Sequence, residues 1–351
     1  MRNYVLKRIA QAVLVLWAAY SLAFLLLSAL PGDAVTNRVQ NPDAQISPES
    51  AQALIEYYGL DRSLWEQYVS SLTAALRGDL GMSLTKGTSV TELIGDVLPS
   101  TLALTGLALV FGIVLSGVLA VAVNYAPWEW LRSAVGSVPA LFGSVPTFVV
   151  GILALQFLSF GIHVIPATDD GSFVALLAPA ATLGILIAAP LAQVLSTSIA
   201  SVRHQPFVHV LHARGAGERY IFRRGVLRNA SLPVLTLLGL ACGELIAGSV
   251  VTEVVFARPG LGNLTVTAVS TQDLPVLQGV VLVATLAYVS VNLLVDLTYP
   301  FIDPRILVDG KAQRVSRIRR KAVRPAIASS RGAGVVAIPA PRGLPLEVSM
   351  P

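Results

Sequence analysis

Six apolar runs dominate this sequence, and each is long enough to cross a lipid bilayer as a helix. The hydrocarbon core of a bilayer needs about 20 mostly apolar residues in a helix. The runs lie at roughly 9–30, 100–124, 134–160, 174–199, 232–256 and 277–300. They are too long and too uniformly apolar for the alternating strands of a membrane barrel. The sequence therefore predicts an all-α polytopic membrane protein with six transmembrane helices.

Composition supports this prediction and excludes a soluble protein. Charged residues make up 13% of the chain and its mean hydropathy is +0.70, whereas a soluble domain carries about 25% charged residues. Arg2, Lys7 and Arg8 precede the first run, as in a signal peptide. That run is longer than the apolar part of a typical signal peptide, so we predict an uncleaved first span. The single cysteine, Cys242, leaves no intrachain disulfide or cysteine metal cluster.

Basic residues predict the orientation, because cytoplasmic loops of membrane proteins carry an excess of Lys and Arg. With the N-terminus in the cytoplasm, 20 of the 25 Lys and Arg residues fall inside. The segment after the first run carries nine acids, which suits the outer face. We therefore expect both termini to be cytoplasmic, and we attribute the net charge of +5 to topology rather than to nucleic-acid binding. Only five basic residues fall outside: Arg38, Arg62, Arg77, Lys86 and Arg258.

The chain divides into three regions. Residues 1–98 hold the first span and an extracytoplasmic segment, residues 99–306 hold a five-helix core with a long loop at 201–231, and residues 307–351 form a basic, then Pro/Ala-rich tail that we predict to be disordered. Within 48–77, helical spacing of apolar residues predicts short amphipathic helices on the outer surface. They are either a self-packed cap or part of a docking surface for a substrate-delivering protein. The apolar positions are Ala51, Leu54, Ile55, Tyr58, Trp65, Tyr68, Val69 and Leu72.

Small residues recur at four-residue spacing inside two of the runs. Such spacing lets helix backbones approach closely, so it predicts a tightly packed helical bundle. The positions are Gly112, Ser116 and Ala120 in the second run and Gly239, Gly243 and Ala247 in the fifth.

The loop at 201–231 carries six arginines against a single acid, Glu218. Apolar residues on both sides of Gly215-Ala216-Gly217 predict two short helices with a break at the glycines. Gly215 and Gly217 are both candidates for the tight turn, because glycine reaches positive φ at little cost. The segment is either a compact knob in the cytoplasm or a positive-inside loop with helices lying at the membrane interface.

Motifs along residues 1–306 resemble those of ABC importer permeases of the dipeptide/oligopeptide/nickel family, in particular the dipeptide-permease B-type subunit. In the loop, His212-Ala213-Arg214-Gly215 and Leu227-Arg228-Asn229-Ala230-Ser231-Leu232-Pro233 are similar to the family's pattern. His212 and Gly225 depart from it locally. The other matching motifs are Pro31-Gly32-Asp33, Tyr58-Gly59-Leu60-Asp61, Arg77-Gly78-Asp79-Leu80-Gly81, Leu98-Pro99-Ser100-Thr101, Glu253 to Gly262, Asp273-Leu274-Pro275, Asn292 to Leu297 and Asp303-Pro304-Arg305.

This resemblance implies type I ABC importer architecture in a bacterial cell membrane. It implies a second homologous permease subunit, two ATPase subunits and an extracytoplasmic binding protein as partners, besides membrane lipid. ATP and Mg²⁺ would be bound by the ATPase subunits, since this chain has no G-x-x-x-x-G-K-[ST] motif and we expect it to bind no cofactor and catalyse no reaction. By the same resemblance, the loop docks on an ATPase subunit through Ala213, Arg214, Gly215, Ala216, Gly217, Glu218 and Arg219.

Ionisable residues within membrane spans are candidates for function. Glu244 lies near the middle of the fifth run and is a candidate for the translocation path, with a protonated or internally hydrogen-bonded acid as the alternative. Asn292 and Asp296 share a helix face and are further candidates, or a structural pair. For Glu253 and Asp296, near the ends of spans, hydration at the interface is the simpler expectation. The four histidines, His163, His204, His209 and His212, form no metal-binding pattern, so we expect no metal site.

The expected cargo is a dipeptide or oligopeptide, with nickel, glutathione or another small solute as alternatives within the family. An ion-coupled secondary transporter is a remote alternative, because such proteins carry several charges near the membrane midplane. A membrane scaffold without a transport role is another.

Overall fold

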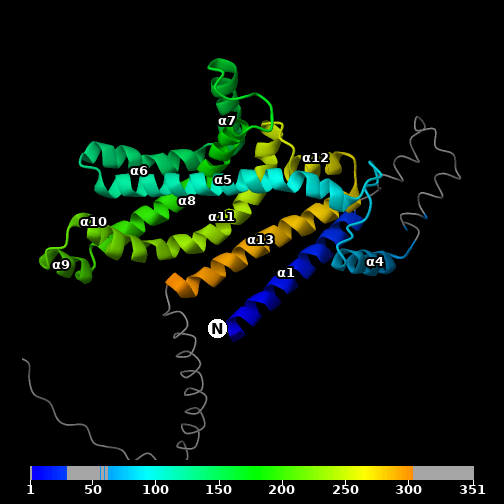
Figure 1. Cartoon of the computed structure of the whole chain (residues 1–351), viewed down its shortest axis with the longest axis horizontal. Coiled ribbons are helices and arrows are strands. Elements are labelled where there is room, and N and C mark those ends of the chain that lie inside the picture. Colours follow the sequence, from blue (N-terminus) through cyan, green and yellow to red (C-terminus); the bar gives the residue numbers. More distant parts are fainter. Residues whose placement is uncertain (1, 30–55, 57–58, 60–61, 303–351) are drawn as a thin grey trace, which may run out of the picture. The chain divides into compact units, whose positions relative to one another are not determined.

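The computed structural model describes residues 2–29, 56, 59 and 62–302, and its regular elements are all helical (Figure 1). The helices run in a first compact unit up to Thr298, and the second unit, Tyr299–Pro351, is described only at 299–302. The long helices are α1 (Arg2–Ser28), α5 (Val90–Tyr125), α8 (Phe173–Arg203), α11 (Leu227–Val255) and α13 (Leu274–Ile302). The shorter ones are α4 (Leu64–Leu76), α6 (Glu129–Ser144), α7 (Thr147–Ala154), α9 (Pro206–Ala213), α10 (Glu218–Tyr220) and α12 (Leu261–Ser270), with π-helical segments at Leu155–Gly161 and Ile221–Val226.

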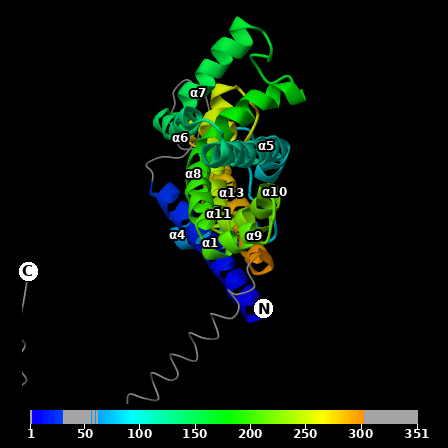
Figure 2. The same ribbon diagram turned by 90° about the vertical axis from the view of Figure 1, so that its left-hand side faces the viewer.

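Five of the six predicted spans are helices long and apolar enough to cross a membrane, which confirms the all-α fold. The third predicted span is not one continuous helix. Residues 134–160 are divided between α6 and the α7 segment, which meet at an angle of 101°. Val145 is extended, with φ −101° and ψ 124°, because the ring of the following Pro146 disfavours helical backbone before it. Over the part of the chain that the structure describes, there are six candidate spans if this bent pair counts as one, and α7 points away from α5 and α8 in both views (Figures 1 and 2).

The core is built around α8, which packs along α5 on one side and α11 on the other. Between α5 and α8 the backbones touch, because a Cβ atom on Gly112 would lie 2.9 Å from the carbonyl oxygen of Gly184. Between α11 and α13, a Cβ atom on Gly239 would meet Asn292, and one on Gly243 would meet Tyr288. The close packing predicted from the small residues is therefore confirmed at these crossings. The central cluster of buried apolar side chains comprises Leu104, Ala108, Ala180, Leu183, Ile187, Leu191, Ala241 and Leu245.

The amphipathic helix predicted after the first span is present as α4. Ser63 caps its N-terminus and forms a reciprocal capping box with Glu66. Tyr68 holds α4 against α1, since its hydroxyl lies 2.6 Å from that of Ser21 and its ring lies 5.3 Å from the ring of Phe24. The other predicted amphipathic positions, 51–58, and the tail at 307–351 lie outside the described residues, apart from residue 56.

Candidate functional site

The loop between α8 and α11 folds into the predicted pair of short helices. Pro206 occupies the first turn of α9, where its missing N–H leaves no intrahelical bond unmade. After α9 the chain reverses at Gly215, whose φ of +77° favours glycine. The amide of Ala216 then donates to the carbonyl of Leu211 across this turn (3.1 Å). Gly217 differs from its expected role: its φ is −70°, and it serves as the N-cap of α10.

We call residues 206–226 the α9–α10 knob. Buried apolar side chains and an aromatic contact pack it against the long helices. Val208, Ile221 and Val226 are buried against residues of α8 and α11. The ring of Phe222 packs edge-on against that of Tyr125 at the end of α5, at a centroid distance of 5.2 Å. Figures 1 and 2 both place α9 and α10 together at the junction of α8 with α11. The knob is therefore packed against the ends of three long helices, α5, α8 and α11.

A second set of contacts braces the junction from the α8 side. The guanidinium of Arg203 donates to the carbonyl of Asn124 (2.6 Å) and lies 4.4 Å from the centre of the Tyr125 ring. The side-chain amide of Asn124 in turn donates to the carbonyl of Ser196 (3.1 Å). These contacts tie the end of α5 to the end of α8 next to the knob.

The turn presents a basic surface. Of the predicted coupling residues, Ala216 is half-buried, and Ala213, Arg214, Gly215, Gly217, Glu218 and Arg219 are exposed. Glu218 lies 3.6 Å from the imidazole of His212, so its side chain closes the turn. Among the described residues, Arg214 and Arg219 have no acidic partner within 4 Å. Both guanidinium groups are thus free to contact a separate protein.

At the opposite end of α11, a buried carboxyl group holds the start of α12. Glu253 is fully buried and accepts hydrogen bonds from the hydroxyl of Thr101 (2.6 Å) and the backbone amide of Gly262 (2.7 Å). The expectation that water at the interface hydrates Glu253 is wrong. Helices α5 and α11 and the N-terminus of α12 enclose its carboxyl group and provide its hydrogen-bond donors. A Cβ atom on Gly260 would collide with that carboxyl, and one on Gly262 with the backbone of Val250. This geometry explains the glycines of the Glu253–Gly262 motif.

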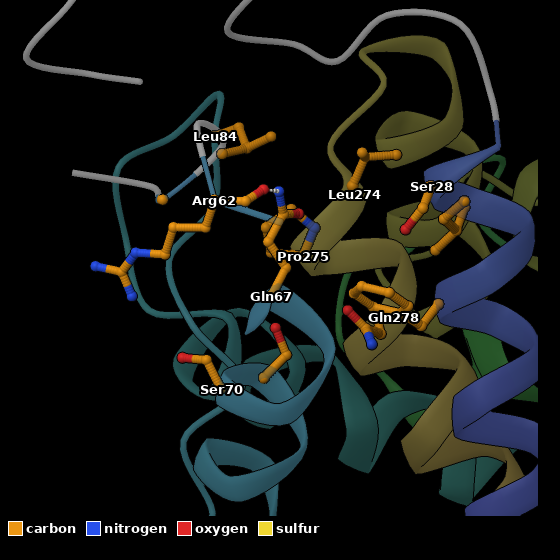
Figure 3. A pocket seen from close by; sticks show the side chains of 12 residues that line it. Ser28, Arg62, Gln67, Ser70, Leu84, Leu274, Pro275 and Gln278 are labelled. Carbon is orange, nitrogen blue, oxygen red and sulfur yellow. Dashed lines mark hydrogen bonds between the residues drawn. The ribbon is translucent and has the colours of Figure 1, made fainter. Parts of the chain in front are cut away.

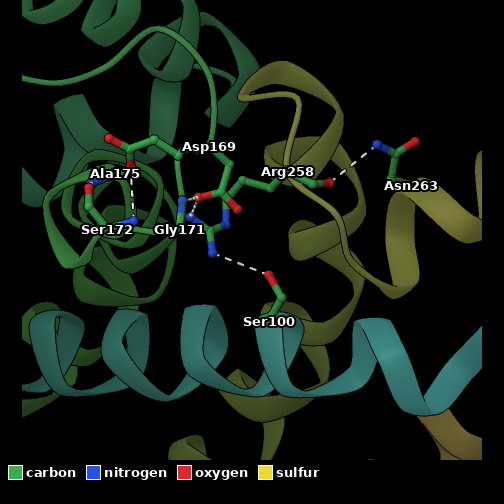
Figure 4. A network of polar contacts seen from close by, with 8 residues as sticks. Ser100, Asp169, Gly171, Ser172, Ala175, Arg258 and Asn263 are labelled. Atoms are coloured by element: carbon green, nitrogen blue, oxygen red, sulfur yellow. Dashed lines mark hydrogen bonds and ion pairs between the residues drawn. The ribbon is translucent and has the colours of Figure 1, made fainter.

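A buried ion pair lies next to this carboxyl (Figure 4). Arg258 contacts Asp169 at 3.1 Å, with 8% of each side chain exposed. Arg258 also donates to the hydroxyl of Ser100 (3.2 Å), so α5, the segment before α8 and the segment after α11 meet at this point. Hydrogen bonds from Ser172 lower the pKa of the neighbouring Asp170. Sequence reasoning missed Asp169, since only the fold brings it to Arg258.

Asp273 joins the segment before α5 to the start of α13. Its buried carboxylate accepts hydrogen bonds from the hydroxyls of Ser83 (2.5 Å) and Thr85 (2.8 Å) and from the backbone amides of Leu84 and Thr85 (3.2 Å each). A cavity of about 150 Å³ lies beside this junction, between the end of α1, the start of α4 and the start of α13 (Figure 3). The Glu253, Arg258 and Asp273 contacts thus form a set of polar ties at this end of α11.

The candidates for the translocation path lie on different faces. Glu244 is exposed on α11. Asn292 is half-buried against Gly239, and its amide donates to the carbonyl of Tyr288 (2.9 Å), so it serves packing between α11 and α13. Asp296 belongs to α13, but its side chain lies outside the described residues, as does the predicted pairing with Asn292. Glu244 is the one candidate of the three that the structure places on an exposed helix face.

Long apolar helices, the α9–α10 knob at one end of α11 and the buried polar ties at the other define a multi-pass helical membrane protein. Residues 108–308 match the family described as the inner membrane component of binding-protein-dependent transport systems. The chain belongs to this family, and it is a permease subunit of an ABC importer located in the inner membrane. The resemblance found in its motifs is thereby confirmed, and an ion-coupled transporter and a scaffold are set aside.

The chain is also similar to individual proteins. The chain is 32% identical over 308 residues to the glutathione transport system permease protein GsiC of Escherichia coli O6:H1, with 87% of this chain and 99% of the relative covered. It is 34% identical over 311 residues to GsiC of Salmonella choleraesuis, with the same coverage. A solved structure described as an amino acid ABC transporter with histidines is 19% identical and has a TM-score of 0.43, covering 57% of this chain and 92% of that one.

Proposed function

We propose that this chain forms half of the translocation pathway of an ATP-driven importer of small peptides, with glutathione as the first cargo to test. Glutathione is itself a tripeptide, so the similarity to glutathione permeases is consistent with the peptide cargo expected from the sequence. Other dipeptides and oligopeptides come next, and nickel remains an alternative within the family. Glu244, Asn292 and Asp296 stay our candidates for contact with the cargo, and Glu244 is favoured by its exposure.

The proposal includes three kinds of protein partner, besides membrane lipid, and an orientation. A second homologous permease would complete the pathway, two ATPase subunits would bind ATP and Mg²⁺, and an extracytoplasmic binding protein would deliver the cargo. The excess of Lys and Arg in the loop and tail favours cytoplasmic termini and a cytoplasmic α9–α10 knob. The polar ties around Glu253 and Asp273 would then lie toward the outer face.

The α9–α10 knob carries the proposal, because it combines an exposed basic turn with rigid attachment to the spans. Arg214 and Arg219 lack acidic partners among the described residues and would pair with acids of the ATPase. When ATP binding closes the ATPase dimer, the knob would shift as a rigid body and carry the ends of α5, α8 and α11 with it. The coupling residues Ala213, Gly215, Ala216, Gly217 and Glu218 would shape the docked turn.

Reconstitution of the complete importer tests this function. The chain, its companion permease, the ATPases and the binding protein are placed in liposomes, and uptake of glutathione, alanylalanine and nickel is measured with and without ATP. We expect ATP-dependent uptake of glutathione, or of the dipeptide, and a stimulation of ATP hydrolysis by the loaded binding protein. Arg214→Glu should abolish that stimulation, while Lys7→Glu, at an exposed basic site on α1 outside the knob, should leave it intact. Uptake of nickel alone, or stimulation that survives Arg214→Glu, contradicts the proposal.

A further inference from the structure

One face of α11 is left uncovered by the rest of the described chain. Leu240 is 58% exposed and Val251 is 43% exposed, and Glu244 and Ala247 are exposed between them. These positions follow each other at intervals of three and four residues, so they form a single stripe along the helix. The opposite face, with Ala241 and Leu245, is buried in the core around α8. The stripe is therefore a surface that this subunit presents outward.

Glu244 lies at the centre of this stripe and at the centre of the span. It is 12 residues from either end of the apolar run 232–256, which is about 18 Å at 1.5 Å per residue. Half of the hydrocarbon core is about 15 Å thick. Within the described residues no hydrogen bond or ion pair reaches its carboxyl group, so an internal bond does not explain it. A carboxyl group at this depth faces protein or a water-filled path rather than lipid.

An apolar cleft of about 450 Å³ lies beside Glu244, between α11, α12 and α13. Gly243 and Ala247, one residue before and three residues after Glu244, both line it. Its far wall carries Thr285 and Tyr288, and Tyr288 packs directly over Gly243. The cleft has the size of a small-molecule pocket. Glu244 itself does not line the cleft but follows Gly243 of the lining, and a carboxyl group and an aromatic ring are both groups that attract an ammonium ion in a dry environment.

We propose that Glu244 binds the protonated amino group of the peptide in transit, while the α11–α13 cleft next to it receives an apolar part of the cargo. This assignment rests on the proposed peptide import and makes this subunit selective for cargo with a free amino group. It predicts that the carboxylate matters for passage and not for assembly. A lipid tail in the cleft, or the companion permease over Glu244, are the competing occupants.

The test uses the complete importer in liposomes, with Glu244→Gln, Glu244→Asp and the control Glu92→Gln. Glu92 is an exposed acid in the first turn of α5, so the control removes the same charge elsewhere. Two quantities are measured for each: uptake of glutathione or alanylalanine, and ATP hydrolysis stimulated by the loaded binding protein. Loss of a charge-assisted hydrogen bond corresponds to about a tenfold effect or more. We expect uptake by Glu244→Gln to fall about tenfold with the stimulation retained, and Glu244→Asp to keep most of the uptake.

The other outcomes overturn the assignment. Unchanged uptake by Glu244→Gln means that Glu244 does not bind the amino group of the cargo. A parallel loss of stimulation, or of the companion permease on purification, means that Glu244 serves the interface between subunits. Failure of the proposed function is distinguished from failure of this assignment by the importer that keeps Glu244. If the proposed function is wrong, that importer takes up neither glutathione nor alanylalanine.

Discussion

Replacing Glu253 with alanine should loosen the end of the bundle where α5, α11 and α12 meet. Its carboxyl group is the acceptor for two short hydrogen bonds, from the hydroxyl of Thr101 (2.6 Å) and the amide of Gly262 (2.7 Å), and for a longer one from the amide of Asn263 (3.4 Å). Glu253 is fully buried, so these donors lose their partner away from water. Each buried donor left unpaired costs about 1–3 kcal/mol. Counting the two short bonds, we expect a loss of about 2–6 kcal/mol of unfolding free energy.

The assay is the thermal unfolding midpoint of the purified protein in detergent. For a chain of this size, each 1 kcal/mol lowers the midpoint by about 2–4 °C, so Glu253→Ala should lower it by about 5 °C or more. Glu253→Gln keeps one acceptor oxygen, so its unfolding midpoint should lie between those of Glu253→Ala and the original chain. Glu92→Ala removes an exposed acid from α5 and is expected to stay within about 0.5 kcal/mol of the original chain. A midpoint for Glu253→Ala equal to that of Glu92→Ala refutes the reasoning.

Three further predictions concern backbone approach, the turn of the knob and the second buried acid. Gly112→Ala should destabilise the protein by about 1–3 kcal/mol in the same unfolding assay, because its Cβ meets α8, whereas Gly117→Ala meets nothing within 4 Å and should be neutral. Gly215→Ala places a side chain at φ +77° and should cost about 1 kcal/mol and reduce binding-protein-stimulated ATP hydrolysis, while Gly215→Asn, whose side chain tolerates positive φ, should lose less of both. Asp273→Ala leaves hydroxyl and amide donors unpaired, so proteolysis of the segment before α5 should become faster; an unchanged rate would contradict this tie.

The long helices were predictable because apolar run length is a strong signal for membrane spans. The bend in the third run was not predicted, although Pro146 is visible in the sequence, since apolar composition is continuous across it. The start of α5 was misplaced for a related reason. The apolar run begins near residue 100 because Glu92 and Asp96 interrupt the apolar pattern before it. The helix nevertheless begins at Val90, since a helix can continue beyond its apolar part.

The turn of the α9–α10 knob was predictable from its glycines, but only the structure separates their roles. Gly215 needs positive φ and Gly217 does not. The buried polar ties were harder, because their partners are far apart in the sequence. Asp169 and Arg258 are 89 residues apart, and Thr101 and Glu253 are 152 apart. From the sequence alone, an acid near the end of a span is expected to be hydrated. Only the fold shows that protein hydrogen-bond donors surround it instead.

Photo-crosslinking from the α9–α10 knob tests the central claim, which is that this subunit contacts the ATPase through the knob. A benzoyl-phenylalanine is placed at Arg219 in the turn or, as a control, at Thr271 after α12, and both sites are exposed. The assembled importer is then irradiated and the products are identified by mass. We predict a covalent adduct with the ATPase subunit from position 219 and none from position 271. An ATPase adduct from 271, or its absence from 219 in a complex that contains the ATPase, would contradict the account.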